Sequence, residues 1–111
     1  MRIAILDTVP KEFWQADLGI TDAEKFVDLL APAMPDAEFH RFYIAEGLFP
    51  VQWQKYDGYL ITGSPVSVND PFDWIRQAEQ LIVKIVKSGK PLAGFCFGHQ
   101  LIARAMVHQQ G

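Results

Sequence analysis

One stretch near the end of the chain, residues 90–102, restricts the fold most strongly. It reads Lys-Pro-Leu-Ala-Gly-Phe-Cys-Phe-Gly-His-Gln-Leu-Ile and contains Cys96, the single cysteine of the chain. Its apolar residues predict a buried strand before the cysteine and the start of a helix after it. Cys96 lies between Gly94 and Gly98, which is the spacing of a nucleophile elbow, a sharp turn from strand to helix. Side chains at the two flanking positions would clash in such a turn, and glycine removes that clash.

The remainder of the chain alternates between strand and helix patterns. Strands are expected at residues 2–6, 38–44, 59–62 and 92–95, and helices from residue 21 to the prolines at 32 and 35, from residue 70 to 88 and from residue 98 to 110. The segment from residue 7 to about residue 20 shows no clear period and is expected to be a loop. Alternating strands and helices predict an open, mostly parallel α/β sheet flanked by helices, with right-handed crossovers.

Local signals support the helix ends. Thr21 and Glu24 have the spacing of a capping box. Asp70 and Pro71 suit a helix cap and first turn. Gly89 suits the left-handed position that follows a helix.

Composition narrows the classes of protein. The chain has 111 residues, half of them hydrophobic, and a net charge of −3, which fits one packed domain over residues 1–111. No basic stripe indicates nucleic-acid binding, and no apolar run reaches the roughly 20 residues of a membrane helix. The start of the chain has a strand pattern and lacks the features of a signal peptide. With one cysteine and no intrachain disulfide, a cytoplasmic location is expected.

Two strand ends are expected to meet at one pocket. The loop Gly63-Ser64-Pro65 and Cys96 each follow a predicted strand, and ligands of open parallel sheets gather beyond the carboxyl ends of the strands. The N–H of Phe97 would point into the same space and could stabilise an oxyanion. The glycine-containing loop could present a second N–H.

Less specific interpretations of the same residues remain open. A free cysteine is most often a small buried apolar residue, which is the alternative for Cys96. His99 could be a base, although a helix starting at the elbow is expected to direct it away from the thiol. A zinc site combining these two residues with His40 or His108 is disfavoured because no ligand-pair spacing repeats, so no metal is expected. Gln100 could bind substrate or lie on the solvated side of its helix.

The chain resembles the class I (triad-type) glutamine amidotransferases in two places. Residues 91–100 resemble the nucleophile signature of that family, and residues 60–65 resemble its oxyanion strand and loop. The Phe-Gly-His-Gln run and the segment at residues 70–75 are similar to the glutaminase domain of GMP synthase and to γ-glutamyl peptidases. The resemblance covers essentially the whole chain, as the N-terminal half of such a domain. It implies a flavodoxin-like sheet and no cofactor.

The resemblance also implies roles for individual residues. Cys96 would attack the side-chain amide of glutamine, or a γ-glutamyl amide, and form a thioester. The N–H groups of Phe97 and Ser64 would form the oxyanion hole, with Gly63 shaping the loop. Gln100 would help to hold the glutamine moiety. The implied partners are glutamine or a γ-glutamyl small molecule and a synthase domain or subunit that accepts ammonia.

One feature of the family is missing from these 111 residues. Its base is a histidine oriented by a glutamate two residues later, and no His-x-Glu occurs in the chain. We therefore expect residues 1–111 to be the N-terminal part of one amidotransferase domain, inactive alone, with an incomplete sheet that favours self-association. The alternatives are an α/β-hydrolase with a cysteine nucleophile and a non-catalytic pseudoenzyme or interaction module.

Overall fold

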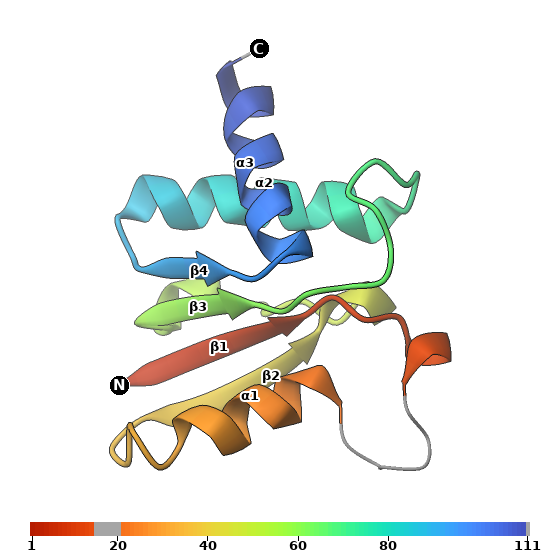
Figure 1. The fold of residues 1–111 in the computed structure, drawn as a ribbon. Helices are drawn as coiled ribbons and strands as arrows, with labels where there is room; N and C mark the ends of the chain where they lie inside the picture. The colour runs from red at the N-terminus through yellow and green to blue at the C-terminus, as the bar shows by residue number, and fades with distance from the viewer. Residues whose placement is uncertain (15–20, 111) are drawn as a thin grey trace.

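The computed structural model describes residues 1–14 and 21–110, which form a four-stranded parallel sheet with helices on both faces (Figure 1). The strands are β1 (Arg2–Asp7), β2 (Glu38–Tyr43), β3 (Gly58–Ile61) and β4 (Leu92–Gly94). The helices are α1 (Asp22–Leu30), α2 (Asp73–Ser88) and α3 (Phe97–Gln110). Short 3-10 turns are η1 (Lys11–Phe13), η2 (Ile44–Glu46) and η3 (Trp53–Lys55). The predicted parallel α/β sheet is confirmed.

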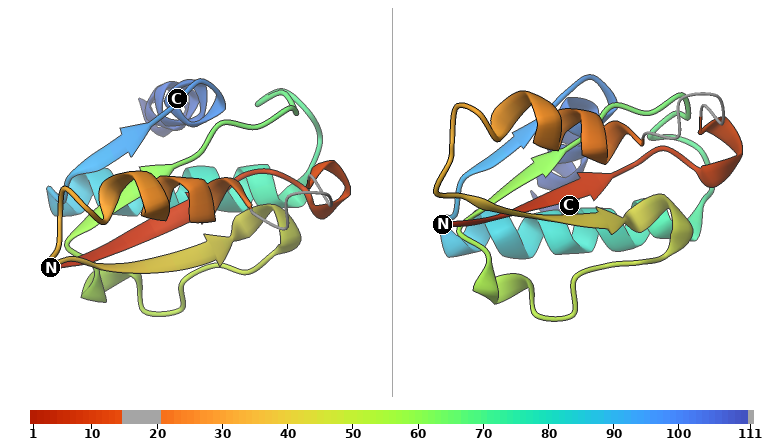
Figure 2. Two further views of the ribbon diagram at one scale, coloured as in Figure 1. Left: turned by 60° about the horizontal axis from the view of Figure 1, so that its bottom comes forward. Right: turned by 90° about the horizontal axis from the view of Figure 1, so that it is seen from below.

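The helices divide between the two faces of the sheet. Figure 2 shows α1 on one face and α2 on the other, and α3 packs beside α2 against β4. Ala4 and Leu6 of β1 belong to the core beneath α2, whereas Ile5, which points to the opposite face, is buried on the side of α1. The apolar face predicted for α2 is confirmed, since Ile75, Ile82 and other residues at helical spacing are buried there.

Most of the predicted helix ends are confirmed. The Thr21 hydroxyl accepts the Glu24 N–H at 3.3 Å, and the Glu24 carboxylate accepts the Thr21 N–H at 3.2 Å, which completes the capping box. Gly89 follows α2 with a φ of 80°. Helix α1 ends at Leu30, close to the prolines that were expected to limit it.

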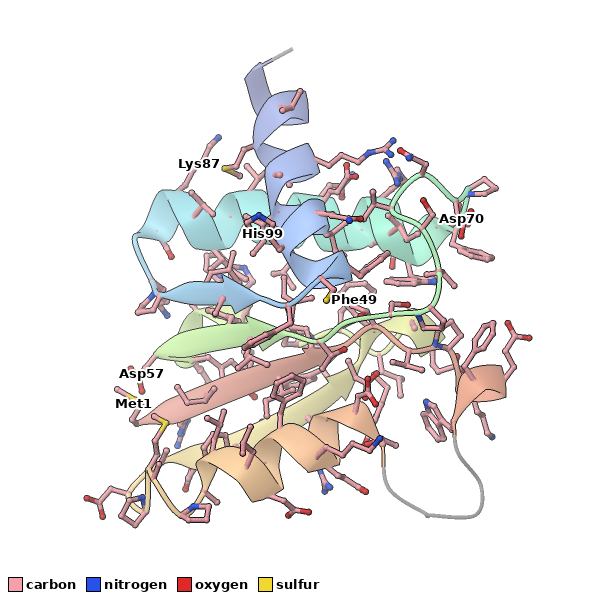
Figure 3. All side chains as sticks on the ribbon, in the orientation of Figure 1. Met1, Phe49, Asp57, Asp70, Lys87 and His99 are labelled. Carbon is pink, nitrogen blue, oxygen red and sulfur yellow. The ribbon has the colours of Figure 1, made fainter. Side chains whose placement is uncertain are left out.

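The cap predicted at Asp70 is wrong. Helix α2 begins at Asp73, and its N-cap residue, Phe72, makes no side-chain cap. The Asp70 carboxylate instead accepts the Ser67 N–H at 2.9 Å and closes a turn in the preceding loop, where Figure 3 labels it. With its carboxylate bonded to the N–H three residues before it, Asp70 is not available to cap the helix that follows.

Smaller differences concern single residues at element ends. The second strand ends at Tyr43 because Ile44 begins a 3-10 turn, the fourth ends at Gly94, and the last helix begins at Phe97 rather than Gly98. The loop predicted between residues 7 and 20 contains η1, and residues 15–20 lie outside the described part of the chain. No helix among the described residues is both long enough and apolar enough to cross a membrane.

Sheet order places the segments that follow three strands next to one another. The order is β2-β1-β3-β4, so β3 lies between β1 and β4. Thr8 follows β1, Gly63 comes shortly after β3, and Cys96 comes shortly after β4. All three therefore lie next to one another, just beyond the carboxyl ends of the strands.

Candidate active site

Cys96 occupies the turn between β4 and α3 in an unusual backbone conformation. Its φ is 49°, and it is the single non-glycine residue with positive φ in the part of the chain that the structure describes. Positive φ is costly for a residue with a side chain and often marks a functional turn. The cysteine is exposed. The turn therefore presents the thiol to solvent just beyond the carboxyl end of β4.

The two flanking glycines lie too close to other backbone atoms to carry a side chain. A Cβ on Gly94 would lie 2.5 Å from the carbonyl carbon of Gly98. A Cβ on Gly98 would lie 2.7 Å from the Ile61 carbonyl oxygen and 2.9 Å from the Ile61 Cβ. These distances are shorter than real Cβ contacts, so β3, β4 and α3 can approach this closely only with glycine at both positions.

The residues between the glycines divide between core and surface. The Phe97 ring is buried and packs on Trp74 with 5.8 Å between ring centroids. The Phe95 ring is 46% exposed and contacts Phe26 across a centroid distance of 5.1 Å. The N–H groups of Gly98 and Gln100 donate to Phe95 and Cys96 carbonyls and close the turn, whereas the Phe97 N–H has no recorded acceptor among the described residues.

The loop after β3 lies directly beside the cysteine. A Cβ on Gly63 would lie 3.8 Å from the Cys96 Cβ and 3.6 Å from the Phe95 carbonyl oxygen. The Ser64 hydroxyl accepts the Val66 N–H at 3.3 Å and supports the turn that follows. Within the described residues, the Ser64 N–H has no recorded acceptor. Two N–H groups without an internal acceptor, those of Phe97 and Ser64, thus belong to segments that meet at Cys96.

A buried pair of threonines, which sequence reasoning missed, joins this loop to the end of β1. The Thr8 N–H donates to the Thr62 hydroxyl at 2.9 Å, and the two hydroxyl oxygens lie 3.1 Å apart. The Thr8 hydroxyl also lies 2.9 Å from the Thr62 carbonyl oxygen and 3.1 Å from that of Gly63. Both side chains are fully buried. The one sequence signal was their position, since Thr8 follows the first predicted strand and Thr62 is the last residue of the third.

Asp7 holds the start of α1 against the end of β1. Its carboxylate accepts the Val9 N–H at 2.8 Å and the Ala23 N–H at 2.9 Å. Burial raises the pKa of the Asp7 carboxyl, and the two N–H groups oppose that shift. This buried carboxylate therefore fixes the connection that lies beside the loop after β3.

A second charged group holds the far side of the same loop. Glu79 of α2 is buried and lies 2.9 Å from an Arg76 nitrogen and 3.0 Å from the Arg104 Nε. Both arginines also donate to the Val68 carbonyl oxygen, at 2.7 and 2.9 Å. The segment between β3 and α2 is thereby tied to both helices on its face of the sheet.

The other polar residues singled out in the sequence are less closely joined to the cysteine. Gln100 is exposed on the first turn of α3, and only its backbone N–H is recorded as bonding to Cys96, at 3.0 Å from the carbonyl oxygen. His99 is exposed on α3, as Figure 3 shows, and has no recorded bond to Cys96. His40 lies on β2, where its ring nitrogen is 3.4 Å from the Tyr56 hydroxyl. The His108 side chain lies outside the described part, and the described residues contain no metal-binding cluster of His, Cys, Asp and Glu.

A pocket of about 280 Å³ lies between the loop after β3 and the connection from β1 to α1. The loop contributes Gly63, Ser64 and Pro65, and the connection from β1 together with α1 contributes Val9, Phe13, Trp14, Thr21, Asp22 and Lys25. The pocket thus adjoins Ser64, whose N–H has no recorded acceptor among the described residues.

Comparison with known proteins agrees with this arrangement. The profile of the family described as Glutamine amidotransferase class-I matches residues 37–109, which include the loop after β3 and the whole elbow. The chain belongs to this family. A solved glutamine amido transferase from Methylobacillus flagellatus superimposes with a TM-score of 0.66 at 25% identity, over 94% of this chain and 38% of that one.

Curated relatives of the amidotransferase chain include gamma-glutamyl peptidases, a putative glutamine amidotransferase and GMP synthases. Gamma-glutamyl peptidase 4 of Arabidopsis thaliana is 38% identical over 82 residues, covering 72% of this chain and 32% of the relative. GMP synthase [glutamine-hydrolyzing] of Aeropyrum pernix is 32% identical over 54 residues, covering 49% of this chain and 10% of the relative. The chain therefore spans a third or less of the length of these two relatives.

Proposed function

We propose that this amidotransferase site hydrolyses the side-chain amide of glutamine or a related γ-glutamyl amide through a thioester on Cys96. The observation that carries the proposal is the position of Cys96. It is held at positive φ on an elbow whose two glycine positions leave no room for a side chain, and it lies beside Ser64, whose N–H has no acceptor among the described residues. Such a combination of exposed nucleophile and oxyanion donors suits acyl transfer.

The proposed reaction has two steps. The Cys96 sulfur attacks the γ-carbonyl carbon, forming a carbon–sulfur bond while an electron pair of the C=O bond moves to the oxygen. The N–H groups of Phe97 and Ser64 donate to that oxyanion, and Gln100 helps to hold the glutamine moiety. The carbon–nitrogen bond then breaks, and ammonia or an amine leaves with the proton that the thiol gave up. Water attacks the thioester, releases glutamate and restores the thiol.

The substrate class and partners are proposed from the relatives. Gamma-glutamyl peptidase and glutamine-hydrolysing GMP synthase are both named for γ-glutamyl or glutamine chemistry. We propose that residues 1–111 form the N-terminal part of one domain, that a histidine and a glutamate outside them supply the base, and that the ammonia passes to a synthase domain or subunit. Without that base, the 111-residue chain should turn over very slowly, because the members of a catalytic triad act as a unit. The family match favours this function over the α/β-hydrolase alternative.

The proposal predicts selective modification of Cys96. The 111-residue chain is incubated with a chloroketone analogue of glutamine, and labelling is followed by mass spectrometry. We expect labelling faster than that of N-acetylcysteine, protection by glutamine, and none in Cys96→Ser. Iodoacetamide, which carries no γ-glutamyl group, is the control reagent, and glutamine should protect less against it. Chloroketone labelling no faster than that of N-acetylcysteine would indicate a non-catalytic module.

A further inference from the structure

We infer that Thr8 is a positioning residue, whose buried hydroxyl orients the Ser64 N–H toward Cys96. This inference rests on the proposed function, in which that N–H is an oxyanion donor. It assigns a role to a residue of the first strand's end that lies far from the elbow in sequence.

Counting the hydroxyl hydrogens shows where the Thr8 hydroxyl points. A threonine hydroxyl has one hydrogen to donate. The Thr62 oxygen already accepts the Thr8 N–H at 2.9 Å, and the Thr8 oxygen lies 3.1 Å away to accept the Thr62 hydrogen. The Thr8 hydrogen is then directed at the carbonyl oxygens of Thr62 and Gly63, at 2.9 and 3.1 Å. In this arrangement every buried hydroxyl of the pair has a partner, as buried polar groups require.

The contact with the Gly63 carbonyl determines the direction of the next N–H. The Gly63 C=O and the Ser64 N–H belong to one planar peptide unit, and the described residues contain no cis peptide bond. In a trans unit the C=O and N–H point in opposite directions. Since the carbonyl points toward Thr8, the N–H points away from it.

Sheet order makes that opposite direction the side of the cysteine. β3 lies between β1 and β4, so the segment after β3 has Thr8 on one side and Cys96 on the other. A Cβ added to Gly63 would lie 3.8 Å from the Cys96 Cβ, which places this peptide within reach of the nucleophile. The Thr8 hydroxyl therefore holds the peptide with its N–H on the reactive side.

The test separates acyl transfer from simple alkylation. The probe is the γ-(4-nitrophenyl) ester of glutamate. The Cys96 sulfur bonds to the γ-carbonyl carbon, the ester C–O bond breaks, 4-nitrophenolate leaves with the electron pair, and the thiol proton goes to the buffer. This step forms an oxyanion but needs no acid to protonate the leaving group. Alkylation by iodoacetamide forms no oxyanion, so it reports only on thiol reactivity and access.

We expect Thr8→Val to slow acylation by about 10- to 100-fold, somewhat less than the loss of a whole oxyanion donor. Its alkylation rate should match that of the unmodified chain. Thr8→Ser, which keeps the hydroxyl, should restore acylation. Ser88→Ala is the matched control, because it removes a hydroxyl that donates to a backbone carbonyl, that of Ile85, at the opposite end of the sheet. It should acylate normally. Should Thr8→Val fail to fold by circular dichroism, Thr8→Ala takes its place.

The outcomes distinguish the inference from the function beneath it. Equal acylation by Thr8→Val and the unmodified chain, or parallel loss of acylation and alkylation, would overturn the role of Thr8. Acylation of the unmodified chain no faster than that of N-acetylcysteine would contradict the proposed function instead. In that case the crystal structure of Thr8→Val decides the inference. A peptide after Gly63 that has turned supports it, and one that keeps its orientation overturns it.

Discussion

At the scale of single residues, the elbow depends on two residues that have no Cβ atom. Gly94 and Gly98 each lie where a Cβ would overlap backbone, and their substitution would separate β3, β4 and α3. The spacing of glycines around Cys96 was visible in the sequence, and the close contacts explain the need for it. The partner of Gly98, Ile61, could not be identified beforehand, because the contact joins residues that are distant in the chain.

Gly98→Ala should lower the free energy of unfolding by about 1–3 kcal/mol, the usual cost of forcing extra atoms into a packed site. The added methyl group would meet the Ile61 carbonyl oxygen at 2.7 Å. Gly63→Ala is the matched control, since its Cβ would meet neighbours only at 3.6 and 3.8 Å, which is ordinary contact. Urea unfolding of both variants measures the difference, and equal stability of the two would contradict this account.

At the scale of elements, local patterns predicted the structure well, and contacts between elements were beyond them. Periodicity identified the strands and helices, and the Thr21 capping box identified the start of α1. Asp70 was misassigned because its carboxylate had two local uses, a helix cap and a turn, and in the structure it serves the turn. Thr8 was missed because its role depends on β1 lying beside β3, and the local sequence of neither strand predicts the order of strands in the sheet.

The joint between β1 and α1 should give stability a particular pH dependence. The pKa of Asp7 is raised by burial above its ordinary value of 3.8, so the folded chain keeps this proton to higher pH than the unfolded chain. The contribution of Asp7 to the free energy of unfolding therefore falls as pH rises through that window. Asp7→Asn cannot titrate at this position, and the stability difference, unmodified chain minus variant, should decrease as the pH rises from below 3.8 toward neutrality. Urea unfolding across that range measures it. A difference that grows with pH would mean that the Val9 and Ala23 N–H groups outweigh burial.

At the scale of the whole molecule, the two edges of the sheet differ in kind. The edge strand β2 carries Glu38 and Arg41, and charges of this sort discourage pairing with another chain. The other edge strand, β4, reads Leu-Ala-Gly and carries no charge. Ala93 is exposed on it, and the exposed Phe95 follows. Among the described residues, β4 pairs only with β3, so its outer side is an uncharged edge.

We predict that the 111-residue chain self-associates through β4. Sedimentation should show a mass that increases with concentration, because an uncharged open strand can pair with that of a second copy. Ala93→Lys, which places a charge on this edge, should shift the chain toward monomer. Val51→Lys is the control, since Val51 is 94% exposed and lies outside the sheet. A stable monomer at high concentration would contradict the prediction.

The contact between Gly98 and Ile61 also has a consequence for the order of assembly. The closest contacts around Gly94 and Gly98 involve no residue beyond His99, in the first turn of α3, and chains emerge from the ribosome N-terminus first. The contacts among the elbow, the loop after β3 and the threonine pair can therefore form during synthesis, as soon as α3 has emerged. Any segment translated later would dock against a finished joint instead of shaping it.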